Sequence, residues 1–173
     1  LAAGGALEVP VFRRPRVSII PSGSEIVPLV DAREEDLRAG RVLPEFNSLI
    51  FSAMITEAGG EAATLPVVPD EPEAIAAAVM AALDGAGPEA GAGADLVILN
   101  AGSSAGSHDY TAHVLESLGE VLVHGVSVMP GKPTILAVVR GKPVIGIPGY
   151  PVSAGIAMEE FVLPLLALWQ KHV

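Results

Sequence analysis

The order of short apolar runs and helix-like segments limits the folds open to this chain more than any other feature of its sequence. Apolar runs of strand length lie at 16–20, 62–67, 95–100, 121–128, 134–139 and 144–147. Helix-like segments lie between or after them, at 47–58, 72–83, 110–118 and 153–169. Parallel strands need crossover connections, which helices usually supply. We therefore predict an α/β fold with three layers, α/β/α, around a mostly parallel sheet, with at least one antiparallel pair among the last three strands.

Length and composition fit one folded domain. The chain has 173 residues, half of them hydrophobic and mainly Ala, Val, Leu and Ile, which suits a buried sheet covered by helices. Residues 1–15 mix Gly, Ala and basic residues, and we expect an N-terminal arm or a linker from a preceding domain. Residues 16–173 are predicted to form the domain. Within it, 31–41 reads as a charged loop and 85–93 as a surface connection without chemistry.

Charge and residue usage limit the partners and the location of the protein. The formal net charge is -10, which opposes binding to nucleic acid or to an anionic membrane surface. The chain has no cysteine, so disulfides and thiolate ligands are excluded. The most apolar stretch, Phe161 to Trp169, is too short for a bilayer and contains Pro164. We expect a cytoplasmic protein that binds neither nucleic acid nor membranes.

Three polar turns follow strands of the predicted sheet. They lie at 21–25, 101–109 and 148–151, after the first, third and last apolar runs. In open α/β sheets, ligands bind beyond the carboxyl ends of the strands, so these turns should gather at one binding edge. The loop Gly102 to Ser107 opens a helix and has the form of an anion site, although a tight turn without a ligand is an equal interpretation. It is neither a P-loop nor a dinucleotide fingerprint.

Four acids lie beside these turns or at helix starts: Glu25, Asp70, Glu71 and Asp109. Carboxylates that face a pyrophosphate are sensible ligands for a bridging Mg²⁺. The alternative is helix capping, which the pattern favours for Asp70 and Glu71, whereas both interpretations stay open for Asp109. Lys132 could present a cation to phosphate or be a solvated turn lysine. The four histidines show no metal-ligand spacing, and Ser104 lacks a nucleophile elbow.

Taken in order, these segments resemble one family, the molybdopterin molybdotransferases, known in bacteria as MoeA and in animals as the gephyrin E domain. The resemblance covers almost the whole chain, and each motif is short but the ordered set is specific. The matching segments are Arg14-Pro15-Arg16-Val17, Ser22-Gly23-Ser24-Glu25, Asn47-Ser48, Asp70-Glu71-Pro72, Gly102 to Tyr110, Pro130-Gly131-Lys132-Pro133 and Ile147 to Ser153.

The resemblance implies an enzyme that inserts molybdate into adenylylated molybdopterin, releases AMP and uses a divalent cation, Mg²⁺, at the pyrophosphate. It implies catalytic roles for Glu25, Asp70 and Asp109, with Glu25 and Asp109 as metal ligands. The pterin substrate would be bound by Ser22, Gly23, Gly102, Ser104, Gly106, Lys132, Pro148, Pro151 and Ser153. Members of the family are homodimers with flanking domains, so we expect this chain alone to bind pterin weakly and to turn over little.

Several positions depart from the family pattern, and most fall where a ligand would lie. They are Ser24, Phe46, Ala101, Ser103, Ala105 and Tyr150. Three alternatives therefore stay open: a non-catalytic molybdopterin-binding or sensory module, a molybdopterin adenylyltransferase with the same fold, and a competence-damage-type protein that hydrolyses a nucleotide derivative.

Overall fold

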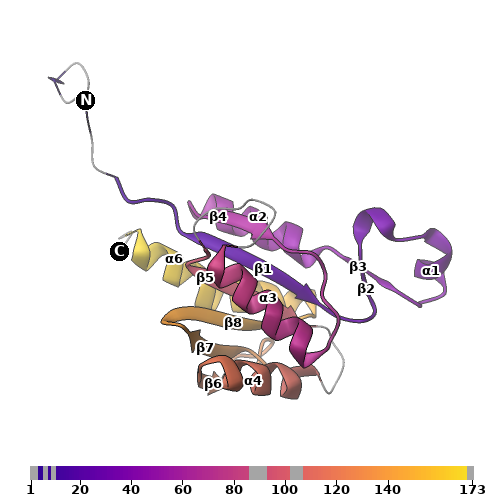
Figure 1. Cartoon of the computed structure of the whole chain (residues 1–173). Helices are drawn as coiled ribbons and strands as arrows, with labels where there is room; N and C mark the ends of the chain where they lie inside the picture. The colour runs from indigo at the N-terminus through magenta and orange to yellow at the C-terminus, as the bar shows by residue number, and fades with distance from the viewer. Residues whose placement is uncertain (1–3, 6–7, 9–10, 86–92, 102–106, 171–173) are drawn as a thin grey trace.

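The central feature of the fold is one six-stranded sheet. The computed structural model describes residues 4–5, 8, 11–85, 93–101 and 107–170 (Figure 1). Across the sheet the strands are β4 (Glu61–Thr64), β1 (Arg16–Ser22), β5 (Leu96–Ala101), β8 (Lys142–Pro148), β7 (Ile135–Val139) and β6 (Glu120–His124). The first four are parallel, and β7 and β6 are each antiparallel to their neighbour. The predicted mostly parallel sheet with antiparallel pairs near its end is confirmed.

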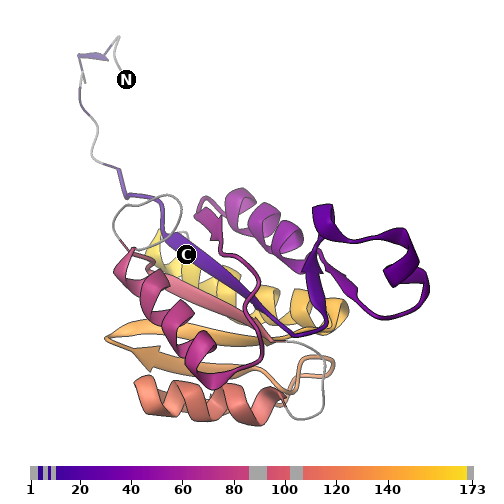
Figure 2. The ribbon, with the colours of Figure 1, turned by 45° about the vertical axis from the view of Figure 1, so that its right-hand side comes forward.

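Helices cover both faces of this sheet, as Figures 1 and 2 show. On one face, α3 (Pro72–Asp84) and α4 (Ser107–Leu118) pack through residues such as Val79 and Leu115 onto Leu99. On the other, α2 (Asn47–Glu57) and the C-terminal helix pack through residues such as Phe51 onto Ile98. Neighbouring residues of β5 point to opposite faces and are both buried, which explains its unbroken apolar sequence. The predicted α/β/α layering is confirmed.

The C-terminal helix begins at Pro151, two residues earlier than predicted. It comprises α5 (Pro151–Ala157), a π-helical turn η3 (Met158–Val162) and α6 (Leu163–Trp169). The π turn ends two residues before Pro164, which has no N–H for the helical ladder and whose ring displaces the preceding turn. By length and composition this helix could cross a membrane, and no other helix of the described residues could. Its buried side chains, which include Met158 and Leu166, make it part of the core.

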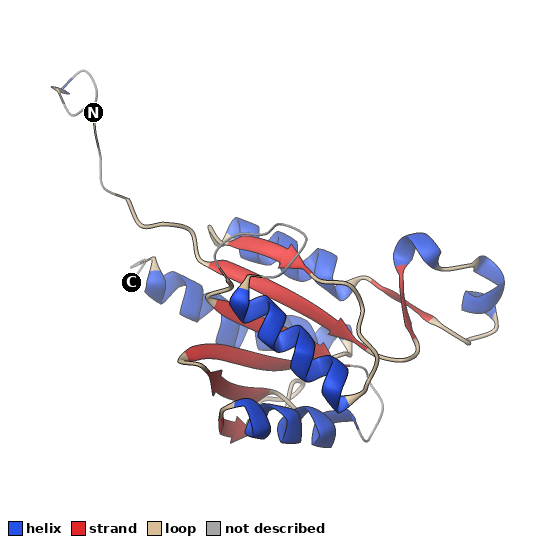
Figure 3. Ribbon diagram, in the orientation of Figure 1, coloured by secondary structure: helices blue, strands red, loops and turns tan. Residues whose placement is uncertain are grey.

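A small lobe projects from the body between β1 and α2 (Figure 1). We call residues 26–45 the side lobe. It holds β2 (Ile26–Pro28), the 3-10 turn η2 (Leu29–Asp31), α1 (Glu34–Arg38) and β3 (Leu43–Glu45), with β2 and β3 paired in parallel. Figure 3 shows this second sheet outside the main one. The prediction of a loop over 31–41 was wrong, because a one-turn helix forms there with an ion pair of 2.6 Å between Glu34 and Arg38.

Other differences from the predicted elements are shifts of their ends. β6 ends at His124 rather than at residue 128, because Gly125 turns the chain with a φ of 86°. The backbone N–H of Gly125 then donates to the carbonyl of Thr134 at 3.0 Å. β4 covers Glu61–Thr64 rather than 62–67, and β1 continues to Ser22. The longer β1 brings Ser22, a predicted site residue, into the sheet itself.

Candidate functional site

The carboxyl ends of the central strands lie side by side. In the strand register Ser22 is opposite Ala101, and Ala101 is opposite Pro148. An isolated parallel bridge adds Val68 on the other side of Ser22. We call this row and the turns that follow it the carboxyl edge. The strand ends thus meet at one edge as expected, and the turn over 102–106 lies outside the described residues.

Around the end of β1 the structure brings Ser22 and Asp70 together. The hydroxyl of Ser22 is fully buried and donates to Oδ1 of Asp70 at 2.5 Å. The backbone N–H of Gly23 donates to the carbonyl of Val68 at 3.1 Å, which holds the two segments together. Glu71 occupies the N-cap position of α3, but its side chain makes no capping hydrogen bond. Asp70 is thus held at the carboxyl edge by a hydroxyl group and is half-buried there.

Glu25 lies next to the same strand end. A Cβ added to Gly23 would be 3.4 Å from Oε2 of Glu25 and 2.7 Å from Cδ1 of Ile26, so both side chains lie directly over this glycine. The carbonyl of Glu25 accepts from the backbone N–H of Leu43 at 2.8 Å, which ties the turn to the side lobe. Ser22, Gly23, Glu25 and Asp70 therefore flank one strand end from two sides.

A metal site is not assembled by the described side chains alone. Within the described part of the chain, no three His, Asp or Glu residues are grouped closely enough to hold an ion. Asp109 lies in the first turn of α4, and its side chain is outside the described residues, as are Gly102, Ser104 and Gly106. That Glu25 and Asp109 bind a metal ion remains a prediction.

The remaining predicted residues meet at the end of β8. Pro148 is the last residue of β8, and Pro151 opens α5. A Cβ on Gly131 would be 3.6 Å from the carbonyl oxygen of Ser153, so the lysine turn packs against the first turn of α5. The hydroxyl of Thr134 donates to the carbonyl of Gly131 at 2.7 Å and fixes the turn. Lys132 is exposed at its tip.

Between these two groups lies a buried polar cluster that the sequence interpretation did not include in the site. The side-chain amide of Asn47 donates to the carbonyl of Gly149 at 2.8 Å and lies 3.5 Å from Oδ1 of Asn100. The carbonyl acceptor fixes the orientation of the Asn47 amide. Asn47 is 6% exposed and Ser48 2%, yet Asn47 Oδ1 and Ser48 Oγ have no partner within the described residues.

Buried polar atoms without partners are uncommon in folded proteins and call for a water or a ligand group. The signals for this cluster were available in the sequence. Asn100 is a polar residue at the end of an apolar run, and Asn47-Ser48 matches the family at the start of a predicted helix.

This fold is an α/β domain with a mostly parallel sheet and a polar carboxyl edge. It is similar to the solved molybdopterin biosynthesis MoeA protein of Pyrococcus horikoshii, with a TM-score of 0.80 and 35% identity over 98% of this chain and 40% of that one. A family described as "Probable molybdopterin binding domain" matches residues 18–168. The chain belongs to this molybdopterin-binding domain family.

Two curated relatives give the context of the domain. The molybdopterin molybdenumtransferase of Nostoc sp. is 32% identical over 96% of this chain and 36% of its own length. The molybdopterin molybdenumtransferase of Bacillus subtilis is 31% identical over 98% of this chain and 36% of its own length. The chain therefore spans a little over a third of these relatives.

Proposed function

We propose that this chain is the pterin-binding domain of an enzyme that inserts molybdate into adenylylated molybdopterin and releases AMP. The observation that supports the proposal is the register at the carboxyl edge, where Ser22, Ala101 and Pro148, each beside a segment that matches the family, lie in one row. Relatives over nearly the whole chain are named molybdopterin molybdenumtransferase, which favours this reaction over adenylyl transfer and over a purely sensory role.

In this proposal the pyrophosphate of the substrate lies against the ends of β1 and β5. Mg²⁺ would bridge it to carboxylates, because this ion prefers a few oxygen ligands together with substrate phosphates. Glu25 and Asp70 fit that donor set, since both are half-buried acids beside the end of β1, and Asp109 in the first turn of α4 would complete it. When bound, the ion would neutralise charge as the bond between the pterin phosphate and AMP breaks.

The protein residues have separate tasks in this scheme. Ser22 holds the Asp70 carboxylate in place through its buried hydroxyl. Lys132, on a turn braced against α5, offers a cation to the phosphates or to molybdate. Pro148, Pro151 and Ser153 form the opposite wall. We also propose that the protein is cytoplasmic. We propose further that the full-length protein forms a homodimer, which light scattering would measure.

Calorimetric titration with adenylylated molybdopterin, with and without Mg²⁺, tests the proposal. We expect binding that needs Mg²⁺ and that Asp70→Asn weakens about tenfold or more, the typical effect of losing a charged partner. Asp84→Asn is the matched control, since Asp84 ends α3 and pairs with Arg140 on the surface. Equal binding without Mg²⁺ and in both variants would refute the site, and AMP transfer from ATP would favour the adenylyltransferase alternative.

A further inference from the structure

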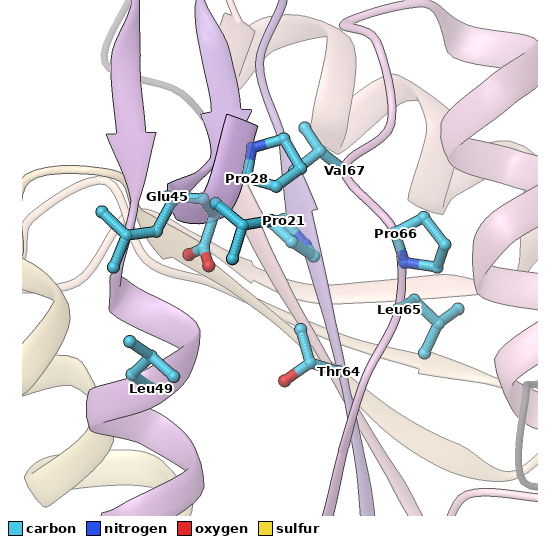
Figure 4. A pocket seen from close by; sticks show the side chains of 10 residues that line it. Pro21, Pro28, Glu45, Leu49, Thr64, Leu65, Pro66 and Val67 are labelled. Atoms are coloured by element: carbon cyan, nitrogen blue, oxygen red, sulfur yellow. The ribbon is translucent and has the colours of Figure 1, made fainter. Parts of the chain in front are cut away.

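A cavity of about 360 Å³ lies where the side lobe meets the body. Figure 4 shows it between the end of β1, the start of α2 and the segment that follows β4. Its size is at the lower end of the roughly 300–1,000 Å³ typical of small-molecule pockets. The walls are mostly apolar and include Pro21, Pro28, Leu49, Pro66 and Val67. Apolar walls of this kind suit the faces of a planar ring.

Glu45 gives this cavity a fixed carboxylate. Among the residues labelled in Figure 4, only Glu45 and Thr64 carry a side-chain oxygen. Oε1 of Glu45 accepts from the backbone N–H of Ser48 at 3.0 Å, so the start of α2 holds the carboxylate in one orientation. Oε2 of Glu45 accepts no hydrogen bond, and the carboxylate pairs with no cation, within the part of the chain that the structure describes.

Two residues of the cavity wall directly precede residues of the carboxyl edge. Pro21, in its wall, precedes Ser22, and its carbonyl accepts from the backbone N–H of Val68 at 2.9 Å. Val67, also in the wall, precedes Val68, which bridges to Ser22. A ligand with its phosphates at the end of β1 could therefore extend its ring into this cavity.

We propose that the cavity binds the 2-amino-4-oxo pyrimidine ring of the pterin and that Glu45 is its specificity-determining residue. This inference rests on the proposed function and locates one end of its substrate. The ring presents two adjacent donors, the 2-amino group and N3–H, and a carboxylate presents two acceptors. Adenine presents one donor beside one acceptor, so its N1 would face a carboxylate oxygen. Glu45 thus selects the pterin end of the substrate over the adenine end.

The length of the connection between β1 and α2 supports a ligand-binding role. Connections of 2–6 residues are usual in α/β units, and long ones in compact domains are commonly functional. Here the connection runs from Gly23 to Phe46 and contains its own two-stranded sheet. That sheet ends with Glu45 and so positions the carboxylate against the body.

Nuclear magnetic resonance titration with free pterin and with lumazine tests the inference. Lumazine has a carbonyl where pterin has the 2-amino group, so its oxygen would oppose Glu45. We expect pterin to shift the backbone amide signals of Ser48, Leu49 and Val67 and to bind about tenfold more tightly than lumazine. Glu45→Gln should abolish this preference, because glutamine offers one acceptor and one donor while it keeps the bond to Ser48.

Glu57→Gln is the matched control, since Glu57 is an exposed residue at the other end of α2, and it should leave the preference unchanged. Leu49→Arg, at an exposed position of the wall, supplies a cation to Glu45 and should also abolish pterin binding if Glu45→Gln fails to fold. Titration of the same samples with Mg²⁺ and inorganic pyrophosphate reports on the carboxyl edge, and Asp70→Asn should weaken only that binding.

The two proposals fail in different ways. No pterin binding, no preference over lumazine, or an equal preference in Glu45→Gln would overturn the assignment of the cavity while pyrophosphate binding still supports the proposed function. If adenosine shifts the same backbone amide signals and pterin does not, the assignment of the pterin ring to the cavity is refuted. If Glu45 selects pterin but pyrophosphate does not bind, the assignment of the cavity holds and the proposed pyrophosphate site at the carboxyl edge is refuted.

Discussion

Replacing Ser22 by alanine should destabilise the domain by about 1–2 kcal/mol. The hydroxyl of Ser22 is fully buried and donates to a carboxylate at 2.5 Å. Hydrogen bonds to charged groups contribute roughly 1.5–3 kcal/mol. Asp70 is only half-buried, so water replaces part of the lost bond, and we place the loss around the lower end of that range, at about 1–2 kcal/mol.

Urea unfolding followed by circular dichroism measures this loss. The midpoint should fall without a change in the m-value, because the surface exposed on unfolding stays the same. For a chain of this length each kcal/mol lowers the melting temperature by roughly 2–4 °C. Ser24→Ala is the control, since Ser24 is exposed in the same turn.

A double-mutant cycle with Asp70→Asn assigns the effect to the pair. We expect a coupling of about 1 kcal/mol between Ser22 and Asp70, typical of residues in direct contact. Two results would refute this reasoning: a loss below about 0.3 kcal/mol for Ser22→Ala, or additive effects in the double variant. Either would show that this bond does not hold the Asp70 carboxylate at the carboxyl edge.

Three further predictions concern stability and turnover. Burial alone would raise the pKa of Asp95, but hydrogen bonds from the Arg13 side chain and the Arg16 backbone outweigh it and lower the pKa below its usual 3.8. This stability is complete above about pH 4 and is lost as the pH falls through the lower folded pKa, so the advantage of the wild type over Asp95→Asn should shrink in acid unfolding curves. Phe51→Ala, at a residue of α2 that is 1% exposed, should destabilise the domain by roughly 3–5 kcal/mol in thermal unfolding. Molybdate-dependent AMP release by this chain alone should be slow compared with that of a full-length relative, and equal rates would contradict the expected need for flanking domains.

Much of the fold could be predicted because its strands bury both faces. The run from Leu96 to Leu99 is fully buried on both sides of the sheet and is apolar without interruption. The start of α3 is equally clear, since Pro72 stands at the first helical position, where the missing N–H has no consequence. Features of this kind are local in sequence and need no tertiary contact to be recognised.

The side lobe could not be predicted, because its short elements do not bury apolar residues in a regular pattern. Its strands have three residues each, too few to show an alternating pattern, and α1 has only five residues. Charged side chains dominate α1, and an i,i+4 ion pair on the surface supports it rather than a buried face. Such an element depends on its attachment to the body, which the sequence does not display.

The site was predictable in its location but not in its contacts. The topology alone places the turns at one edge, because parallel strands end together. The bond from Ser22 to Asp70 joins residues 48 positions apart, and the bond from Asn47 to Gly149 joins residues 102 positions apart. Pairings at that separation depend on strand register and on how α2 docks, and no local pattern encodes them.

The distribution of charge supports the divalent cation of the proposed function. The strand ends opposite the carboxyl edge hold basic residues that are already paired, such as Arg13 with Asp95 and Arg16 with Glu61 at the start of β1. At the carboxyl edge the described acids Glu25 and Asp70 face the place proposed for a pyrophosphate, and the protein has a net charge of -10. Like charges repel strongly where water is partly excluded, and the positive charge of Lys132 offsets only one of these negative charges. In the proposed function, Mg²⁺ held by these carboxylates would offset that repulsion, so the acids that would reject the free anion would accept its magnesium complex.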